Sequence, residues 1–489
     1  MIRVAMIGAG SIGFTRRLFM DILSVEELRD TEFRFMDIHQ DNLDMVAQLC
    51  TKMAEDNGLK ANIVATTNQR EAIRDADYVI CTARVGGLEA FKHDIEIPLK
   101  YGVDQCVGDT LGPGGVFFAL RTIPVLLDIA KDMREVAPNA LLLNYSNPMA
   151  MNTWALRRAG GIHVVGLCHG VQGGHSQIAR ALGLDKSEVD IVCAGINHQT
   201  WYVEVNHKGQ DMRPYLLEAF EKHPDLSERE PTRIDVLKRF GYYSTESNGH
   251  LSEYLPWYRK RPEEIDRWIY NGDWIGGRTG GYLYHCMEKT DEYREMFPKW
   301  MKGEEEYIKL GQRSEEHGSY IIEALETGRV YRGHFNVENR GLITNLPDGC
   351  TVELPGYVDG AGMQPTFVGD LPLQCAATCN VSVSVQEMAV EAALTGNREL
   401  VKLAILHDPL TAAVCSPEEV WAMCDEMFDA LAQWLPQFNG EGRTWEDIPA
   451  PKGYYTKSAG RVGPVPSTLT GEQSVTGSDE RWSVGYKDS

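Results

Sequence analysis

The feature that most constrains the fold of this chain is a glycine-rich turn near its N-terminus. The apolar run at residues 3–7 predicts a buried strand, which leads into GAGSIG at residues 8–13 and then an amphipathic stretch to Leu23. A G-x-G-x-x-G turn between a strand and a helix is typical of dinucleotide binding. The first glycine permits the tight turn, the second lets the backbone approach a pyrophosphate, and the third packs helix against strand. The residues predicted to bind the dinucleotide are Gly8, Gly10, Ser11 and Gly13.

The residues that follow this turn predict a Rossmann-like sheet. A second strand, at residues 32–36, ends in Asp37, whose carboxylate can bind an adenosine ribose and repels a 2′-phosphate, so NAD is favoured over NADP. Further strands alternate with helical segments as far as residue 167, which predicts a parallel sheet. We therefore predict an α/β fold with an N-terminal Rossmann-like doubly wound parallel sheet, residues 1–198. An α+β substrate, metal and oligomerisation domain, residues 199–448, would follow it.

Charge and cysteine usage narrow the class of partner and the compartment. The formal net charge of −22 argues against nucleic acid or an anionic membrane as a partner. Eleven scattered cysteines without a paired framework suit a reducing compartment. We see no apolar run of membrane-spanning length, and Met1 leads directly into the first strand without a signal peptide. We expect a cytoplasmic protein.

Polar side chains follow several of the predicted strands, where ligands bind in sheets of this type. Arg84 stands beside two glycines, and its guanidinium suits a polar substrate. Asn147 either forms a plain Asx turn or hydrogen-bonds a ligand hydroxyl. Asp109 belongs to the glycine-rich stretch 108–115, which is either a connector or a loop that folds over the cofactor or the sugar.

A thiol and two imidazoles stand at the ends of two later strands. Cys168 and His169 lie in GLCHGVQGG at residues 166–174, and His198 ends the strand-like piece at residues 191–198. Thiolate and imidazole are ligands for a borderline divalent metal, so Cys168 and His198 could hold one ion from separate segments. The alternative is a buried structural cysteine with two hydrogen-bonded histidines.

Several sequence blocks, in matching order from Met1 to about Ala450, resemble glycoside hydrolase family 4 and within it the melibiase-type α-galactosidases. These blocks are GAGS, DTLGPGG followed by RTIP, NYSNPMAMNTWA, GLCHGVQGG, CAGINH and GYYSTES. The resemblance implies a need for NAD, a divalent metal (usually manganese) and reducing conditions, and it suggests a homodimer or homotetramer. NAD-dependent members of this kind are exceptions to hydrolysis by two carboxylates.

The resemblance also implies roles for single residues. Cys168 and His198 match the metal ligands. Tyr242 best matches the tyrosine that acts as base toward the C2 proton, with Tyr243 less favoured, although the residues alone would favour a buried aromatic at 242. His169 replaces an aspartate that is proposed as general acid in some relatives. The positions that match substrate-facing residues are Arg84, Asp109 and Asn147.

The reaction implied is an indirect hydrolysis: oxidation at C3 with NAD, metal-assisted elimination, addition of water and re-reduction, with no net redox change. The blocks favour an unphosphorylated α-galactoside. Gly170 opens space without a polar contact and also occurs in α-glucuronidase-like members, so an α-glucuronide or α-glucoside remains an alternative. An NAD-dependent hydroxy-acid dehydrogenase and a non-catalytic NAD-binding regulator are more distant alternatives.

The second half of the chain carries fewer signals. We expect His250 and Glu253 to be solvated helix residues, and the basic run at residues 259–261 to be a solvated face. From residue 449 to 489 the composition shifts to Pro, Gly, Ser and Thr, which predicts an extended or disordered tail.

Overall fold

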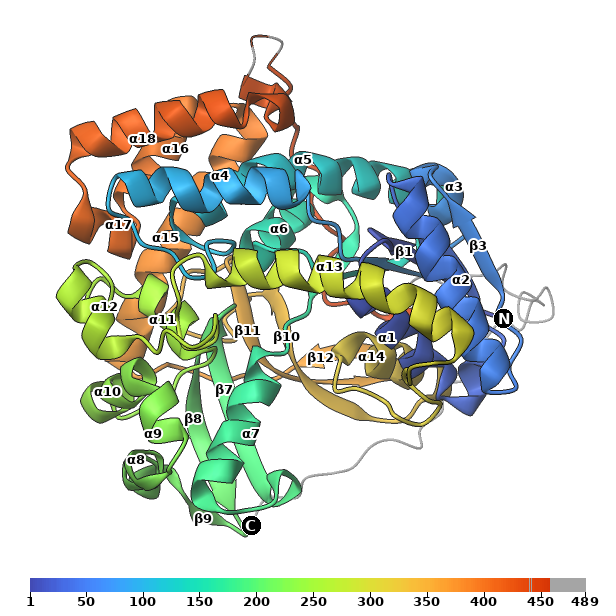
Figure 1. Ribbon diagram of the computed structural model, residues 1–489, viewed down its shortest axis with the longest axis horizontal. Coiled ribbons are helices and arrows are strands. Elements are labelled where there is room, and N and C mark those ends of the chain that lie inside the picture. The colour runs from blue at the N-terminus through green and yellow to red at the C-terminus, as the bar shows by residue number, and fades with distance from the viewer. Residues whose placement is uncertain (439, 441, 458–489) are drawn as a thin grey trace, which may run out of the picture.

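The computed structural model describes residues 1–438, 440 and 442–457 of the chain (Figure 1). Its N-terminal half is a parallel sheet with the order β3-β2-β1-β4-β5-β6. This is the Rossmann order, so the predicted fold class is confirmed. The strands are β1 Arg3–Ile7, β2 Glu32–Met36, β3 Ile63–Thr66, β4 Tyr78–Cys81, β5 Leu141–Asn144 and β6 His163–Gly166.

Continuous apolar runs explain why the central strands form where they do. Strands β4 and β5 read YVIC and LLLN, and every residue in them is buried. Strands that are covered by helices on both faces of a parallel sheet have this composition. The connecting helices are α1 Ile12–Leu23, α2 Gln40–Asp56, α3 Gln69–Ile73, α4 Gly87–Lys100, α5 Gly112–Val136, α6 Met149–Ala155 and α7 Gly170–Leu182.

The C-terminal half extends the same sheet with antiparallel strands. The order continues from β6 as β10-β11-β7-β8-β9, and β12 pairs with β11. These strands are β7 Val189–Ile196, β8 Gln199–His207, β9 Gln210–Asp211, β10 Tyr331–Glu338, β11 Thr351–Asp359 and β12 Gly362–Pro365. In Figure 1 the blue N-terminal elements lie on the right and β7 to β9 reach down at the lower centre, so the sheet joins opposite regions of the molecule.

A single row of paired residues makes this join. Gly166 at the end of β6 pairs with Asn336, Asn336 pairs with Glu353, and Glu353 pairs with Gly195 near the end of β7. The chain segments that follow Gly166 and Gly195 therefore leave the sheet from one row of residues.

Helices from the second half complete the fold. They are α8 Arg213–Lys222, α9 Leu226–Arg229, α10 Pro231–Phe240, α11 Asn248–Tyr254, α12 Pro262–Trp268, α13 Gly281–Lys302, α14 His317–Thr327, α15 Leu373–Thr395, α16 Arg398–Leu406, α17 Pro409–Val414 and α18 Pro417–Ala430. Residues 449–457 of the expected tail lie along the sheet, where the N–H of Met363 donates to the carbonyl of Tyr455 at 2.8 Å. The rest of that tail, 458–489, lies outside the described residues.

Helix α5 is long and apolar enough to cross a membrane, which the sequence expectation overlooked. Its most apolar window is 89% buried inside the protein, as in the core helix of a soluble fold.

A buried ion pair holds α5 to α4. The Arg121 Nη1 donates to Asp94 Oδ1 at 2.9 Å, and its Nε donates to the carbonyl of Val85 at 2.9 Å. The pair thus fixes the turn that carries Arg84.

Removing the charge of Asp94 should destabilise the whole protein. In the variant Asp94→Asn the fully buried Arg121 guanidinium loses its counter-ion, and one broken buried pair costs about 3–5 kcal/mol of unfolding free energy. Urea unfolding followed by tryptophan fluorescence measures this. Glu218→Gln, which breaks an exposed pair with Lys222, is the control and should change little. Equal midpoints for both variants would contradict the structural role of Asp94.

Candidate functional site

The turn after β1 has the geometry that its glycines predict. Gly8 has a φ of +82°, and a Cβ there would lie 2.7 Å from the backbone of Ala83. The N–H of Gly10 donates to Asp37 Oδ2 at 2.8 Å, and a Cβ on Gly10 would lie 2.7 Å from that oxygen. Ser11 precedes the first turn of α1. The turn is therefore a cradle that side chains would fill, beside a carboxylate and a helix N-terminus, and it fits a dinucleotide.

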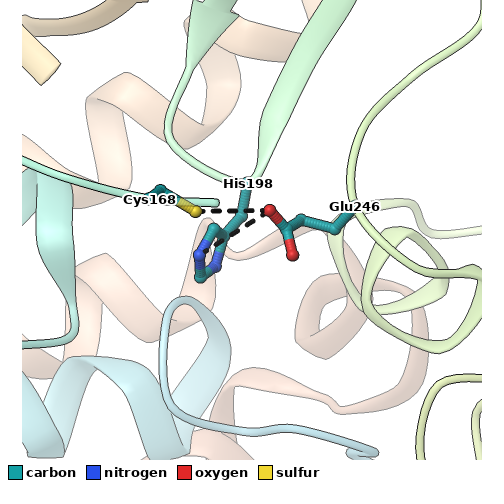
Figure 2. A group of neighbouring side chains, drawn as sticks. All are labelled: Cys168, His198 and Glu246. Carbon is teal, nitrogen blue, oxygen red and sulfur yellow. Dashed lines mark hydrogen bonds and ion pairs between the residues drawn. The ribbon is translucent and has the colours of Figure 1, made fainter. Parts of the chain in front are cut away.

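Three potential metal ligands meet at the ends of β6 and β7 (Figure 2). Cys168, His198 and Glu246 each offer one ligand atom, and these atoms lie within 4.8 Å of one another. Cys168 Sγ is 3.4 Å from Glu246 Oε1, and His198 Nε2 is 3.9 Å from the same oxygen. A thiol, an imidazole and a carboxylate suit a borderline divalent cation and leave coordination positions for a substrate. We refer to these three residues as the metal cluster.

The backbone and the charges of this cluster fit a cation. His198 lies in the turn between β7 and β8 with a φ of +62°, a left-handed conformation that costs a non-glycine residue roughly 1–2 kcal/mol. Burial lowers the pKa of His198 to about 4, so the imidazole is neutral and able to ligate near pH 7. Burial also raises the pKa of Cys168, and a bound divalent cation would stabilise its thiolate. Burial opposes ionisation of Glu246, but the imidazoles around it lower its pKa.

Glu246 is a potential metal ligand that sequence reasoning missed, although it lies in the GYYSTES block. A Cβ on Gly170 would stand 1.4 Å from Glu246 Oε1. The sequence had suggested that Gly170 opens space without a polar contact. In the structure the carboxylate of Glu246 fills that space, so the two residues form one interlocking unit.

The structure brings together the three predicted substrate-binding residues. Arg84 Nη2 lies 3.0 Å from Asp109 Oδ2, and Asn147 Nδ2 donates to both Asp109 oxygens at 3.3 Å. The Arg84 guanidinium stacks over Phe91 at 4.4 Å, and its Nη1 is buried with no hydrogen-bond partner among the described residues. Burial opposes ionisation of Asp109, but Arg84 and nearby imidazoles lower its pKa. We refer to Arg84, Asp109 and Asn147 as the substrate group. Together they offer a hydrogen-bond donor and an acceptor to a polar ligand.

Thr110 connects this group to the metal cluster. Its Oγ1 donates to Asp109 Oδ1 at 2.8 Å and lies 3.0 Å from His198 Nδ1. The substrate residues and the metal ligands therefore form one continuous polar site.

The expectation that His250 and Glu253 are solvated is wrong. Both are buried: His250 Nε2 lies 2.7 Å from His198 Nδ1, and His250 Nδ1 lies 2.8 Å from Glu253 Oε2. Burial opposes protonation, but Glu253 and the neighbouring carboxylates raise the pKa of His250. Arg259 is also buried, in an ion pair with Asp104, whereas Lys260 is half-buried and Arg261 is exposed. The spacing of three between His250 and Glu253 on α11 was the available signal.

The predicted acid, His169, directly follows the cluster residue Cys168 in the chain, whereas the side chain of the predicted base packs elsewhere. Tyr242 is half-buried, and the Cζ of Arg213 lies 5.8 Å from its ring centroid. Tyr243 is buried, and its hydroxyl donates to Gln177 Oε1 at 3.1 Å. Among the described residues, no hydrogen bond joins either hydroxyl to the cluster. His169 is exposed, with Nδ1 3.6 Å from Glu316 Oε1. The roles of Tyr242 and His169 stay predictions.

Another tyrosine lies at the cluster. The Tyr254 hydroxyl donates to the carbonyl of Asn197 at 3.4 Å, and its ring centroid is 5.3 Å from that of His250. Burial raises the pKa of Tyr254, and the charges of Glu246, Glu253, Asp109 and Cys168 raise it further. Its place beside His198 was not visible in the sequence.

The chain matches two family models and several named relatives. Residues 3–184 match the model described as family 4 glycosyl hydrolase, and residues 193–411 match its C-terminal domain. An α-galactosidase of Rhizobium meliloti (strain 1021) is 56% identical over 438 residues, which are 89% of each chain. An α-galactosidase of Bacillus subtilis (strain 168) is 36% identical over 90% of this chain and 100% of its own.

A solved structure shares the fold across nearly the whole chain. It is a 6-phospho-β-glucosidase from Thermotoga maritima with manganese, NAD⁺ and glucose-6-phosphate. Its TM-score is 0.73 at 24% identity, covering 88% of this chain and 99% of that one.

The interlock of Gly170 with Glu246 is open to a direct test. Gly170→Ala places a methyl group where the carboxylate lies, so Glu246 must leave the cluster. We expect Mn²⁺ affinity, measured by the electron paramagnetic resonance signal of free Mn²⁺, to fall at least about tenfold, the loss of roughly one charged ligand contact. Gly173→Ala on the same helix is the matched control, because a Cβ there meets nothing within 4 Å. Unchanged affinity in Gly170→Ala would remove Glu246 from the ligand set.

Proposed function

The chain is a member of family 4 of the glycosyl hydrolases, and we propose that it hydrolyses O-linked α-galactosides with the help of NAD and a divalent metal, most simply Mn²⁺. The observation that carries this proposal is that a dinucleotide turn and the metal-cluster residue Cys168 follow strands at the same edge of one parallel sheet. Relatives that are 56% and 36% identical over nearly the whole chain bear the name α-galactosidase. The solved relative with manganese and NAD⁺ supports both cofactors.

The residues of this chain have distinct tasks in the proposed reaction. Gly8, Gly10, Ser11 and Gly13 would hold the pyrophosphate, with Asp37 at the ribose. Bound NAD supplies a hydride acceptor for C3 of the sugar, and a bound divalent cation supplies Lewis acidity toward the oxidised sugar. Cys168 and His198 would hold that cation, with Glu246 as a third ligand.

The substrate group orients the sugar. The Arg84 Nη1 and the Asn147 amide are donors, and Asp109 is an acceptor, so together they can read vicinal hydroxyls. Tyr242 is proposed as the base that takes the C2 proton, since it lies four residues before Glu246 in the same block. His169, exposed at the start of α7, is proposed as the group that delivers a proton to the leaving oxygen.

The structure bears on the alternative sugars. An α-glucuronide carries a negative carboxylate, and the space beside Gly170 already holds the carboxylate of Glu246. A uronide carboxylate that entered the space beside Gly170 would face the carboxylate of Glu246, and repulsion between like charges would then favour a neutral sugar. An α-glucoside differs from an α-galactoside only at C4 and remains an outcome of the test.

We also propose a cytoplasmic homodimer or homotetramer, with a dinucleotide domain at 1–198 and a substrate domain at 199–448. All eleven cysteines are free, which suits a reducing compartment. Size-exclusion chromatography with light scattering measures the assembly.

Hydrolysis should require every proposed cofactor. We expect p-nitrophenyl α-galactoside to be cleaved only with NAD⁺, Mn²⁺ and thiol together, faster than the α-glucoside or α-glucuronide, and without net NADH. NADP⁺ should not replace NAD⁺, because of Asp37. Cys168→Ser should abolish release. Cleavage of only the glucoside or glucuronide would overturn the sugar, and NADH that accumulates on a hydroxy acid would overturn the hydrolase.

The identity of the base separates two tyrosines. We expect Tyr242→Phe to lower kcat by about 10²–10⁴-fold, the usual contribution of general base catalysis, and to stop deuterium uptake at C2 in D₂O. Tyr254→Phe is the matched variant and should retain deuterium uptake. Loss of uptake in Tyr254→Phe alone would assign the proton transfer to Tyr254 instead.

A further inference from the structure

A chain of hydrogen bonds runs from His198, a proposed metal ligand, through His250 and Glu253 to the protein backbone. We refer to this chain of bonds as the relay. His198 Nδ1 lies 2.7 Å from His250 Nε2, and His250 Nδ1 lies 2.8 Å from Glu253 Oε2. The other oxygen of Glu253 accepts the N–H groups of Val107 at 2.9 Å and Gly108 at 3.1 Å. All three side chains are buried, so solvent does not compete for these bonds.

The direction of each bond follows once a cation occupies His198 Nε2. The ligating nitrogen must then carry a lone pair, so the imidazole proton sits on Nδ1 and faces His250. His250 must accept that proton's hydrogen bond with Nε2, which puts its own proton on Nδ1, toward Glu253. The carboxylate of Glu253 can only accept, and it does so from His250 and from two backbone donors. Each donor therefore meets an acceptor.

Thr110, the second neighbour of His198 Nδ1, is consistent with these proton positions. Thr110 has one hydroxyl proton, which it donates to Asp109 Oδ1 at 2.8 Å. A lone pair of Thr110 Oγ1 is left for His198 Nδ1, 3.0 Å away. Both neighbours thus present acceptors to His198 Nδ1.

We propose that Glu253 and His250 are positioning residues, which hold the proton of His198 on Nδ1 and so present its Nε2 lone pair to the metal. The inference rests on the proposed metal site. Partners of this kind fix the tautomer and the ring orientation of a ligating histidine, and their loss commonly weakens metal binding about 10–100-fold.

The same carboxylate also ties the metal ligand to the substrate group. Glu253 holds the backbone at Val107 and Gly108, directly before Asp109, which binds Arg84 and Asn147. One buried residue therefore sets the position of both His198 and the loop that reads the sugar.

The test is Glu253→Gln, which keeps the shape and changes one acceptor into a donor. The amide oxygen will face the two backbone N–H groups, because the reverse orientation opposes donor to donor twice. The amide N–H then faces His250 Nδ1, which must turn its own proton to Nε2 and toward His198. His198 is left with its proton on the ligating nitrogen. We expect Mn²⁺ affinity, measured by electron paramagnetic resonance, to fall about 10–100-fold.

Two further variants separate this effect from a general loss of structure. Glu230→Gln removes another buried carboxylate, which pairs with Arg233 outside the relay, and its Mn²⁺ affinity should match the wild type. His250→Phe keeps a ring and removes both nitrogens, and Thr110 still accepts from His198, so its loss should be smaller than that of Glu253→Gln. Thermal unfolding of each variant reports folding.

The outcomes distinguish the relay from the metal site. Wild-type Mn²⁺ affinity in Glu253→Gln would overturn the relay alone, and so would a larger loss in His250→Phe than in Glu253→Gln. Wild-type protein that binds no Mn²⁺ would overturn the metal site and the relay with it. We expect the Mn²⁺ affinity to be lowest in Glu253→Gln and higher in His250→Phe. A merely structural role of Glu253 would not produce this order.

Discussion

The pairing of β6 with β10 is the constraint on which the rest of the site depends. Through Gly166, Asn336, Glu353 and Gly195 it joins the parallel and the antiparallel halves in one row. Gly166 has room for no side chain, since a Cβ there would lie 2.6 Å from Met149 Sδ and 2.8 Å from Asn336 Cβ. Because the join is this close, the segment after β6 and the turn after β7 can place Cys168 and His198 within ligand distance of each other.

The site contains several buried carboxyl groups, and each is compensated in a different way. Asp109 is balanced by the guanidinium of Arg84, whereas Glu246 is surrounded by imidazoles. Glu353 accepts a hydrogen bond from Asn197 but has no cationic partner among the described residues. Burial raises its pKa to about 8, so it is mostly neutral near pH 7. A carboxylate that ionised there would repel Glu246. With Glu353 neutral, Glu246 is the carboxylate of this pair that would face a divalent cation.

The sequence predicted what depends on local pattern and missed what depends on distant partners. The glycine turn, Asp37 and the Rossmann-like parallel sheet follow from neighbouring residues, and the chemistry of thiol and imidazole, together with the resemblance of whole blocks, selected Cys168 and His198. Glu246, His250, Glu253 and Arg259 were not recognised as buried site residues, because a charged side chain is usually solvated unless a partner meets it. His250 lies 52 residues from its partner His198, and Arg259 lies 155 residues from its partner Asp104. No periodicity in a segment encodes such a contact.

The carboxyl edge of the parallel sheet explains why a hydrolase would combine these parts. Gly8 follows β1, Arg84 follows β4, Asn147 follows β5 and Cys168 follows β6, so four neighbouring strands deliver their ends to one edge. Ligands of open α/β sheets bind there. Arg84 and Asn147, the residues proposed to bind the sugar, follow the two strands that lie between β1, before the dinucleotide turn, and β6, before Cys168. The strand order therefore explains why residues that would hold a hydride acceptor and residues that would hold a Lewis acid stand at the same edge of the sheet, as oxidation followed by elimination would require.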